Sequence, residues 1–184
     1  SKPCEADRFA LIYAHAQKNI GPAGVTVVVI HNDVIAQVPE GLPSFLDYRV
    51  QAKAHSNFNT PPVFAIYTVL LVTRWLLHDI GGLAAMAQIN QTKAATLYAA
   101  LEASAGFYRG WAATADRSLM NVAFNLPTPA LEQQFLAEAR AAGFSGLNGH
   151  RAIGGLRASI YNALALPAVE KLVGFMADFQ RQVR

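Results

Sequence analysis

The stretch FALIYAHAQKNIGPAGVTVVVI, residues 9–30, contains two apolar runs joined by a short connection. The runs 9–14 and 25–30 are rich in β-branched and aromatic residues, and they fit strands that are buried on both faces. The connection carries Lys18 and the turn sequence Gly-Pro-Ala-Gly at 21–24, and it is too short to contain a crossover helix. We therefore expect the two strands to pair antiparallel.

The rest of the chain reads as an α/β fold. We expect a short helix from Asn32 or Asp33, an irregular segment over 39–62, a core helix over 63–78 that stops at the two glycines 81–82, and a second long helix over 83–104. A small α/β or α+β unit follows, with strands over 119–126, 146–149 and 156–161 and helices over 128–142 and from Pro167.

Composition excludes several classes of protein. The 184 residues are 53% hydrophobic and 15% charged, as in a globular protein of one or two domains. The formal charge of +3 is scattered, whereas nucleic-acid surfaces need clustered cations. The five histidines are dispersed and Cys4 is the one cysteine, so no metal site is expected, and the thiol is compatible with a reducing cytoplasm. Arg74 interrupts the apolar segment 61–77, which favours a core helix over a membrane span.

Lys18 is the first candidate for chemistry. A lysine at the end of a buried strand would lie near low-dielectric surroundings, which disfavour the ammonium and favour a nucleophilic amine. Such an amine can form a Schiff base with a carbonyl compound. The alternative is a surface lysine whose aliphatic stem packs on apolar chain.

Two further stretches carry groups suited to anions. In SNFNTPP (56–62), Asn59 and Thr60 precede a helix and could bind a phosphate, although Thr60 could equally cap that helix with Pro61 in its first turn. In GHRAIGGLRASIYN (149–162), Arg151 and Arg157 could present guanidinium groups to two anions, or could instead form structural salt bridges.

Five stretches together resemble the phosphoserine aminotransferases, which are pyridoxal-phosphate enzymes of fold type I. They are AQKNIGPAG (16–24), FNTPP (58–62), GGL..M...N..KA (81–94), RS.MNV.F.L (117–126) and GHR..GG.RASIYNA (149–163). The resemblance implies that residues 1–80 are the end of the large cofactor-binding domain with the start of the long interdomain helix, and that 81–184 are the small C-terminal α/β domain. It also implies amino transfer from glutamate to 3-phosphohydroxypyruvate in serine biosynthesis, with a related substrate in pyridoxine biosynthesis.

The same resemblance implies roles for individual residues. Lys18 matches the lysine that forms the Schiff base with pyridoxal 5'-phosphate and then moves the substrate proton, and Gln17 matches a residue that contacts the cofactor. Asn59 and Thr60 match the pair that reaches the cofactor phosphate across a homodimer interface.

The substrate-binding residues are implied in the same way. His150 and Arg151 match residues that hold the substrate phosphate or the side-chain carboxylate of glutamate, and Arg157 matches the arginine that binds the α-carboxylate. The implied protein is a cytoplasmic homodimer that acts on phosphorylated and dicarboxylate small molecules, with no nucleic-acid or membrane partner.

Three departures from the family pattern bear on these expectations. Ala123 stands where proline is usual, and His15 stands where a small residue is common. Family members also carry a comparably long region before the lysine, with the phosphate loop, the ring-stacking aromatic and the aspartate for the pyridine nitrogen. We therefore expect a C-terminal part that has little activity alone. The alternatives are a non-catalytic anion-binding module and a structural domain derived from such an enzyme.

Overall fold

The computed structural model describes residues 1–183 and contains two compact units. The first spans Lys2–Leu83, and the second begins at Ala84 and also takes in Ser1. Among the residues described, no single helix is long and apolar enough to cross a membrane; the segments Val63–Asp79 and Leu83–Ala103 meet that test only when taken together.

The first unit is built on a β-hairpin. Strands β1 (Leu11–Ala16) and β2 (Val25–Ile30) pair antiparallel from Leu11 opposite Ile30 to Ala16 opposite Val25, which confirms the predicted pairing. His15 is accommodated because its Nδ1 lies 2.9 Å from the hydroxyl of Thr26, its cross-strand neighbour. The prediction of strands buried on both faces is wrong for this chain, since the hairpin forms a sheet of only two strands. Tyr13, for example, is 73% exposed.

The turn that joins the two strands packs against helix α3 (Val63–Arg74). A Cβ atom on Gly21 would lie 3.0 Å from Cγ2 of Val69, so glycine permits the close approach of turn and helix. Ala65 is the one buried residue of α3 within the described chain, so the prediction of a core helix is wrong here. After Arg74 the helix widens into a π-helical turn, Trp75–Asp79.

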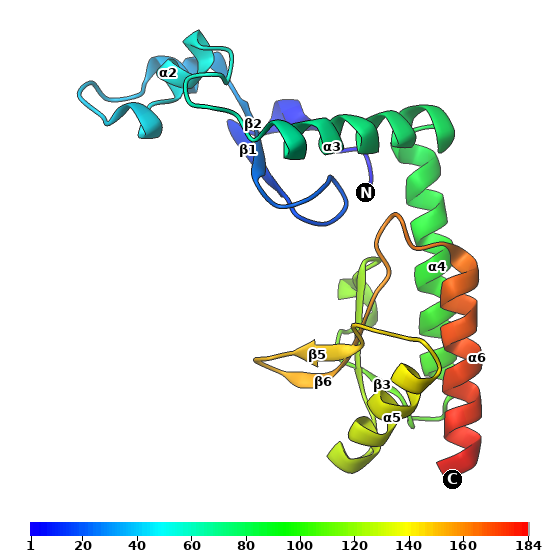
Figure 1. Cartoon of the computed structure of the whole chain (residues 1–184). Helices are drawn as coiled ribbons and strands as arrows, with labels where there is room; N and C mark the ends of the chain where they lie inside the picture. Colours follow the sequence, from blue (N-terminus) through cyan, green and yellow to red (C-terminus); the bar gives the residue numbers. More distant parts are fainter. Residues whose placement is uncertain (184) are drawn as a thin grey trace. The chain divides into compact units, whose positions relative to one another are not determined.

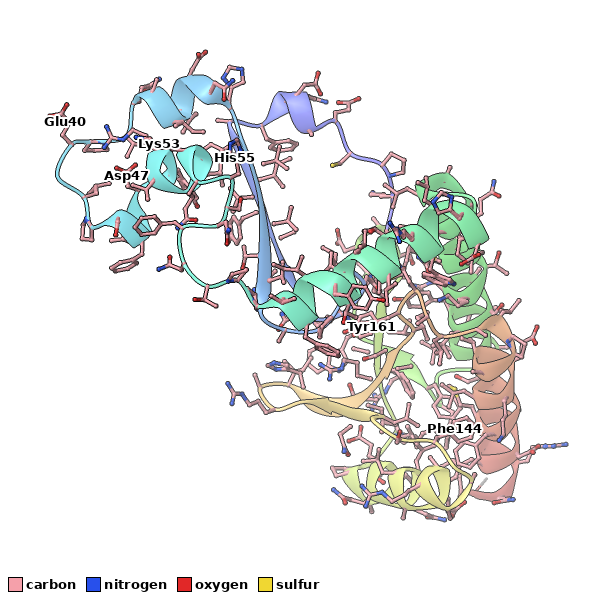
Figure 2. The ribbon with its side chains drawn as sticks, turned by 45° about the horizontal axis from the view of Figure 1, so that its top comes forward. Glu40, Asp47, Lys53, His55, Phe144 and Tyr161 are labelled. Carbon is pink, nitrogen blue, oxygen red and sulfur yellow. The ribbon has the colours of Figure 1, made fainter. Side chains whose placement is uncertain are left out.

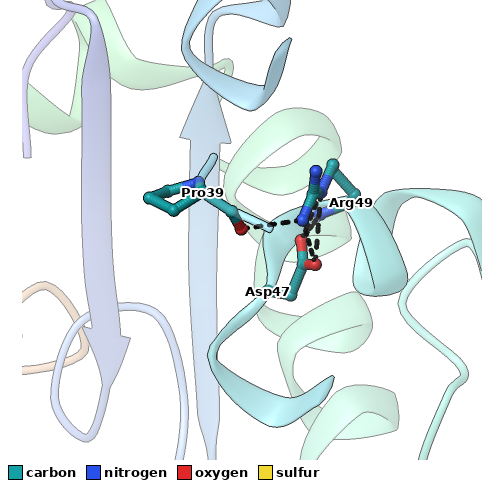
Figure 3. Close-up of polar contacts among 3 residues, drawn as sticks. All are labelled: Pro39, Asp47 and Arg49. Atoms are coloured by element: carbon teal, nitrogen blue, oxygen red, sulfur yellow. Dashed lines mark hydrogen bonds and ion pairs between the residues drawn. The ribbon is translucent and has the colours of Figure 1, made fainter. Parts of the chain in front are cut away.

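The segment between β2 and α3 is more regular than predicted. Helix α1 (Asn32–Ala36) confirms the predicted short helix, but the part predicted to be irregular contains a 3-10 turn (Ser44–Leu46) and α2 (Tyr48–Lys53). Asp47 caps α2 by accepting the N–H of Arg49 at 2.9 Å. The Arg49 guanidinium donates to both carboxylate oxygens of Asp47 and, at 2.9 Å, to the carbonyl of Pro39 (Figure 3). This hydrogen-bonded arginine lowers the pKa of Asp47.

The second unit is a four-stranded antiparallel sheet covered by three helices. The strand order is β3-β4-β6-β5, and Figure 1 shows α4 and α6 lying alongside each other. The elements are α4 (Leu83–Ala103), β3 (Arg109–Gly110), a 3-10 turn (Thr114–Asp116), β4 (Asn121–Asn125), α5 (Pro129–Ala141), β5 (Asn148–His150), β6 (Gly154–Ser159) and α6 (Leu166–Val183). Sequence patterns predicted each of these helices and every strand except β3, which has two residues. Thr128 caps α5 by accepting the N–H of Leu131, with Pro129 in the first turn as predicted.

The two faces of this sheet differ in chemistry because side chains alternate along β4 and β6. One face packs on the helices in a core with a large aromatic cluster; its strand residues are Val122, Phe124, Leu156, Ala158 and Ile160. The alternate positions, Asn121, Ala123, Arg157 and Ser159, are only partly buried. This second set, which we call the open face, carries Arg157, one of the candidate functional residues.

Candidate functional site

Gln17 and Lys18 follow directly on Ala16, the fully buried last residue of β1. The strand therefore fixes where the backbone of Lys18 lies, but both Gln17 and Lys18 are exposed. The prediction that Lys18 lies in low-dielectric surroundings is wrong for the described chain, because the hairpin is covered on too little of its surface. Any desolvation of the Lys18 amine must come from atoms outside residues 1–183.

Asn59 and Thr60 lie in the loop before α3. The helix begins at Val63 with Pro62 as its N-cap residue, and no side chain caps it. The alternative that Thr60 caps the helix is therefore wrong, because the helix starts later than the Thr-Pro-Pro sequence suggested. Both side chains are exposed, and neither makes a hydrogen bond to another residue of the described range. An amide and a hydroxyl thus remain available to a ligand.

His150 and Arg151 lie at the tip of the β5–β6 hairpin. His150 pairs with Gly154, and its Nδ1 accepts the N–H of Ala152 at 3.2 Å. This contact assigns the proton of a neutral ring to Nε2, which can then donate outward. Arg151 is exposed, and its guanidinium forms no ion pair with a described residue. The tip therefore presents the Nε2–H of His150 and the guanidinium of Arg151, for which no described residue supplies an acceptor.

Arg157 lies on β6, directly opposite Ala123 of β4. Its N–H donates to the Leu147 carbonyl on one side at 2.9 Å, while the Ala123 carbonyl accepts from Trp111 on the other. The two residues thus form a non-hydrogen-bonded pair, in which side chains come closest. The small side chain of Ala123 leaves the arginine room on the open face.

The Nε of Arg157 is buried and has no hydrogen-bond partner within residues 1–183. Buried donors without partners are rare, because each costs about 1–3 kcal/mol of desolvation. No ion pair among the described residues involves Arg157, so the alternative of a structural salt bridge finds no support here. A carboxylate on the open face would satisfy the guanidinium with two parallel hydrogen bonds.

The β5–β6 hairpin carries all three basic residues, at two separate places. His150 and Arg151 lie at the tip, and Arg157 lies further along β6, three residues after Gly154, the cross-strand partner of His150. No group of acidic, histidine or cysteine side chains in the described chain is arranged to hold a metal ion.

Sequence reasoning missed a polar network beside Arg157. The Oδ1 of Asn121 accepts the hydroxyls of Ser159 at 3.0 Å and Tyr161 at 3.1 Å. These residues belong to the stretches RS.MNV and RASIYN. Polar residues alternate there with core residues along β4 and β6, and this alternation could have indicated the network. Figure 2 labels Tyr161 on the segment that leaves β6.

Comparison with known proteins identifies the family. The model of the family described as aminotransferase class-V matches residues 2–172. A phosphoserine aminotransferase of Geobacillus kaustophilus is 54% identical over 182 residues, which are 99% of this chain and 50% of that protein.

Two solved structures are also similar. The phosphoserine aminotransferase from Bacillus circulans subsp. alkalophilus has a TM-score of 0.95 and 46% identity, covering 98% of this chain and 50% of its own. The pyridoxal-phosphate-bound phosphoserine aminotransferase from Trichomonas vaginalis has a TM-score of 0.88 and 34% identity, covering 96% and 50%. The chain spans about half the length of the curated relatives it matches, and its fold is that of a fold type I aminotransferase. By the family match over nearly its whole length, the chain belongs to the class-V aminotransferases.

Proposed function

We propose that this chain is the C-terminal part of a phosphoserine aminotransferase. The complete protein, meaning this chain with the half of its relatives' length that it does not span, transfers the amino group of glutamate to 3-phosphohydroxypyruvate. The products are 2-oxoglutarate and 3-phosphoserine. Identity of 54% to a phosphoserine aminotransferase over 99% of the chain supports the reaction. The observation that carries the proposal is the buried, unpartnered Nε of Arg157, which a substrate carboxylate would satisfy.

The residues present fit part of a pyridoxal-phosphate site. When bound, this cofactor supplies an aldehyde that accepts the amino group and a ring that withdraws electrons from the substrate Cα. Lys18 holds the cofactor through its amine and later carries the proton to and from the substrate Cα. Gln17 contacts the cofactor beside it. The exposed amide of Asn59 and hydroxyl of Thr60 donate hydrogen bonds to the phosphate of the cofactor held by a second subunit.

The β5–β6 hairpin holds the substrate at both ends. Arg157 binds the α-carboxylate through its guanidinium fork, which fixes the orientation of Cα. His150 and Arg151 bind the phosphate of phosphoserine or the side-chain carboxylate of glutamate. One pair of donors serves both substrates because both groups are anions at similar distances from the α-carboxylate. The proposal extends to the phosphorylated hydroxy-amino acid of pyridoxine biosynthesis, because that substrate carries the same two kinds of anionic group.

Helix α3 supports a homodimeric assembly. Most of its large apolar side chains are exposed, with Phe64 at 79% and Tyr67 at 54%, although the face with Ala65 and Val69 lies against the hairpin turn. A helix that is apolar all round is normally buried. In the complete protein, α3 is covered by the remaining half of the chain and by a second subunit, which places Asn59 and Thr60 next to the partner's cofactor. We expect this enzyme to work in the cytoplasm.

Substitution of Lys18 tests the cofactor role. In the complete protein, Lys18→Ala should abolish the visible absorbance of the covalently held cofactor and reduce transamination by several orders of magnitude. Lys53→Ala, a matched change at an exposed lysine on α2, should retain both. Undiminished absorbance in Lys18→Ala would contradict the assignment. Robust turnover by the 184-residue chain alone would contradict the proposal that it holds only part of the site.

Substrate choice is tested by comparing phosphoserine with serine. The phosphate role of His150 and Arg151 requires a much higher kcat/KM for phosphoserine, and Arg151→Ala should lower that value while changing kcat/KM for serine little. Equal kcat/KM values for the two amino acids in the unsubstituted enzyme would exclude the role. Addition of the pyridoxine-pathway substrate in competition would rank the two phosphorylated amino acids as substrates.

A further inference from the structure

Lys93 on α4 is buried completely, although lysine is among the residues least often found inside proteins. Its ammonium donates three hydrogen bonds to backbone carbonyls: Tyr161 at 2.7 Å, Leu164 at 3.0 Å and Ile160 at 3.2 Å. No carboxylate of the described residues forms an ion pair with it. The Schiff-base role proposed for Lys18 is not proposed for Lys93.

The hydrogen bonds decide against a nucleophilic role for Lys93. An ammonium has three protons and no lone pair, and all three protons have acceptors here. Burial lowers the pKa of Lys93, whereas the three carbonyls favour the charged form. A neutral amine would leave one carbonyl without a donor. The arrangement therefore serves to hold the three carbonyls in place.

The three carbonyls lie where the chain leaves the sheet. Ile160 and Tyr161 follow the last residue of β6, and Leu164 lies two residues before α6 begins. One turn earlier on α4, the buried amide of Asn90 donates to Asn162 Oδ1 at 2.9 Å. Lys93 and Asn90 thus hold four of the five residues 160–164 to one face of α4. We call this pair of residues the α4 clamp.

Contacts on the open face lead from the α4 clamp to the cross-strand pair next to that of Arg157. Tyr161, whose carbonyl accepts the shortest bond from Lys93, donates its hydroxyl to Asn121. Asn121 also accepts from Ser159, its cross-strand partner. The next cross-strand pair along the same face is Ala123 with Arg157. The position of the Arg157 side chain therefore depends on how the downstream end of β6 is held.

We propose that Lys93, assisted by Asn90, is a positioning residue that fixes the end of β6 and thereby aligns the Arg157 guanidinium for its anionic ligand. The inference rests on the proposed carboxylate-binding role of Arg157. Lys93 does not touch the substrate; it acts through the three carbonyls and the network of Asn121. A misplacement of about 1 Å at such a group costs on the order of a hundredfold in rate.

The first test is hydrogen exchange in the 184-residue chain, which needs no enzymatic activity. Lys93→Met keeps the apolar stem and removes the three donors. The amides of Arg157 and Ile160, which donate to the carbonyls of Leu147 and Met120, should exchange at least tenfold faster, whereas amides within α5 should not change. Lys171→Met, at an exposed lysine on α6, is the matched control. Unchanged exchange at Arg157 in Lys93→Met would overturn the proposal.

The second test separates positioning from general stability in the complete enzyme. Lys93→Met should raise KM for glutamate and for phosphoserine tenfold to a hundredfold. The visible absorbance of the bound cofactor should not change, because Lys18 is untouched. If Lys93→Met does not fold, Asn90→Ala, which removes a single hydrogen bond, should show a smaller KM rise of the same kind. Unchanged KM in a folded variant would overturn the proposal. Absence of transamination in the unsubstituted enzyme would instead refute the proposed function, and the exchange experiment would still decide on the α4 clamp.

Discussion

Arg157→Met should raise the free energy of unfolding of the chain and lower kcat/KM of the complete enzyme. The buried Nε of Arg157 has no partner among residues 1–183, and an unsatisfied buried donor costs about 1–3 kcal/mol. Methionine keeps most of the apolar stem and removes that donor. Because Arg157 is only partly buried, we expect the lower end of this range, a gain of about 1 kcal/mol in the free energy of unfolding.

The effect on activity has the opposite sign and is larger. A guanidinium that binds a carboxylate in a bidentate manner supplies two charge-assisted hydrogen bonds, each contributing about 2 kcal/mol. Their loss should lower kcat/KM for phosphoserine by about three orders of magnitude, since every 1.4 kcal/mol is a factor of about ten. Arg157→Lys should recover little of this, because an ammonium cannot provide the fork.

Urea unfolding of the 184-residue chain measures the first effect, and steady-state kinetics of the complete enzyme measure the second. Arg140→Met, on the exposed surface of α5, is the matched control and should change both by less than about 0.5 kcal/mol. If Arg157→Met destabilised the chain by more than 1 kcal/mol, Arg157 would be a structural residue. The carboxylate-binding role would then lose its main support.

Three further predictions concern the second unit. Gly155→Ala should destabilise the second unit by about 2 kcal/mol or more, because Gly155 has φ +67° and a Cβ there would lie 2.6 Å from Asn125 Nδ2. The control Gly174→Ala, on α6, should be neutral or stabilising. Thermal unfolding of the two variants compares them. Phe135→Ala should cost about 3–5 kcal/mol in urea unfolding, because its fully buried ring contacts several other aromatic rings in the core. Burial lowers the pKa of Lys93 below its usual 10.5, so the unfolded chain binds more protons between the folded-state pKa and 10.5, and stability should rise with pH through that window. Lys93→Met should remove this rise, as measured by unfolding at a series of pH values up to 10.

Local patterns predicted the elements whose formation depends on neighbouring residues. The Gly-Pro-Ala-Gly turn with its flanking valines gave the β1–β2 pairing, and Thr128 with Pro129 marked the start of α5. In each case the deciding contacts lie within a few residues of one another. The cap at Asp47 is equally local, but a proline- and glycine-rich surrounding concealed it, so α2 was missed.

Burial could not be predicted from the same patterns, because an apolar run does not say what covers it. Helix α3 and the hairpin have the composition of core elements, yet Phe64 and Tyr13 are largely exposed within these 184 residues. Lys93 is the converse case, a charged residue that lies on a helix among apolar neighbours and is fully buried. Its three acceptors are 67 to 71 residues away in the chain, so no sequence window contains them.

Hydrogen-bond satisfaction separates the two cations that matter most in the second unit. Lys93 is fully buried and every one of its protons has an acceptor, so it has nothing left to offer a ligand. Arg157 is less buried, yet it retains a donor that no described residue satisfies. A protein gains no stability from such a donor, and the proposed carboxylate ligand would satisfy it. The proposed roles follow this difference: Lys93 holds the strand, and Arg157 binds the ligand. Lysine at position 157 or arginine at position 93 is therefore not expected to take over the role of the native residue, although both residues carry one positive charge.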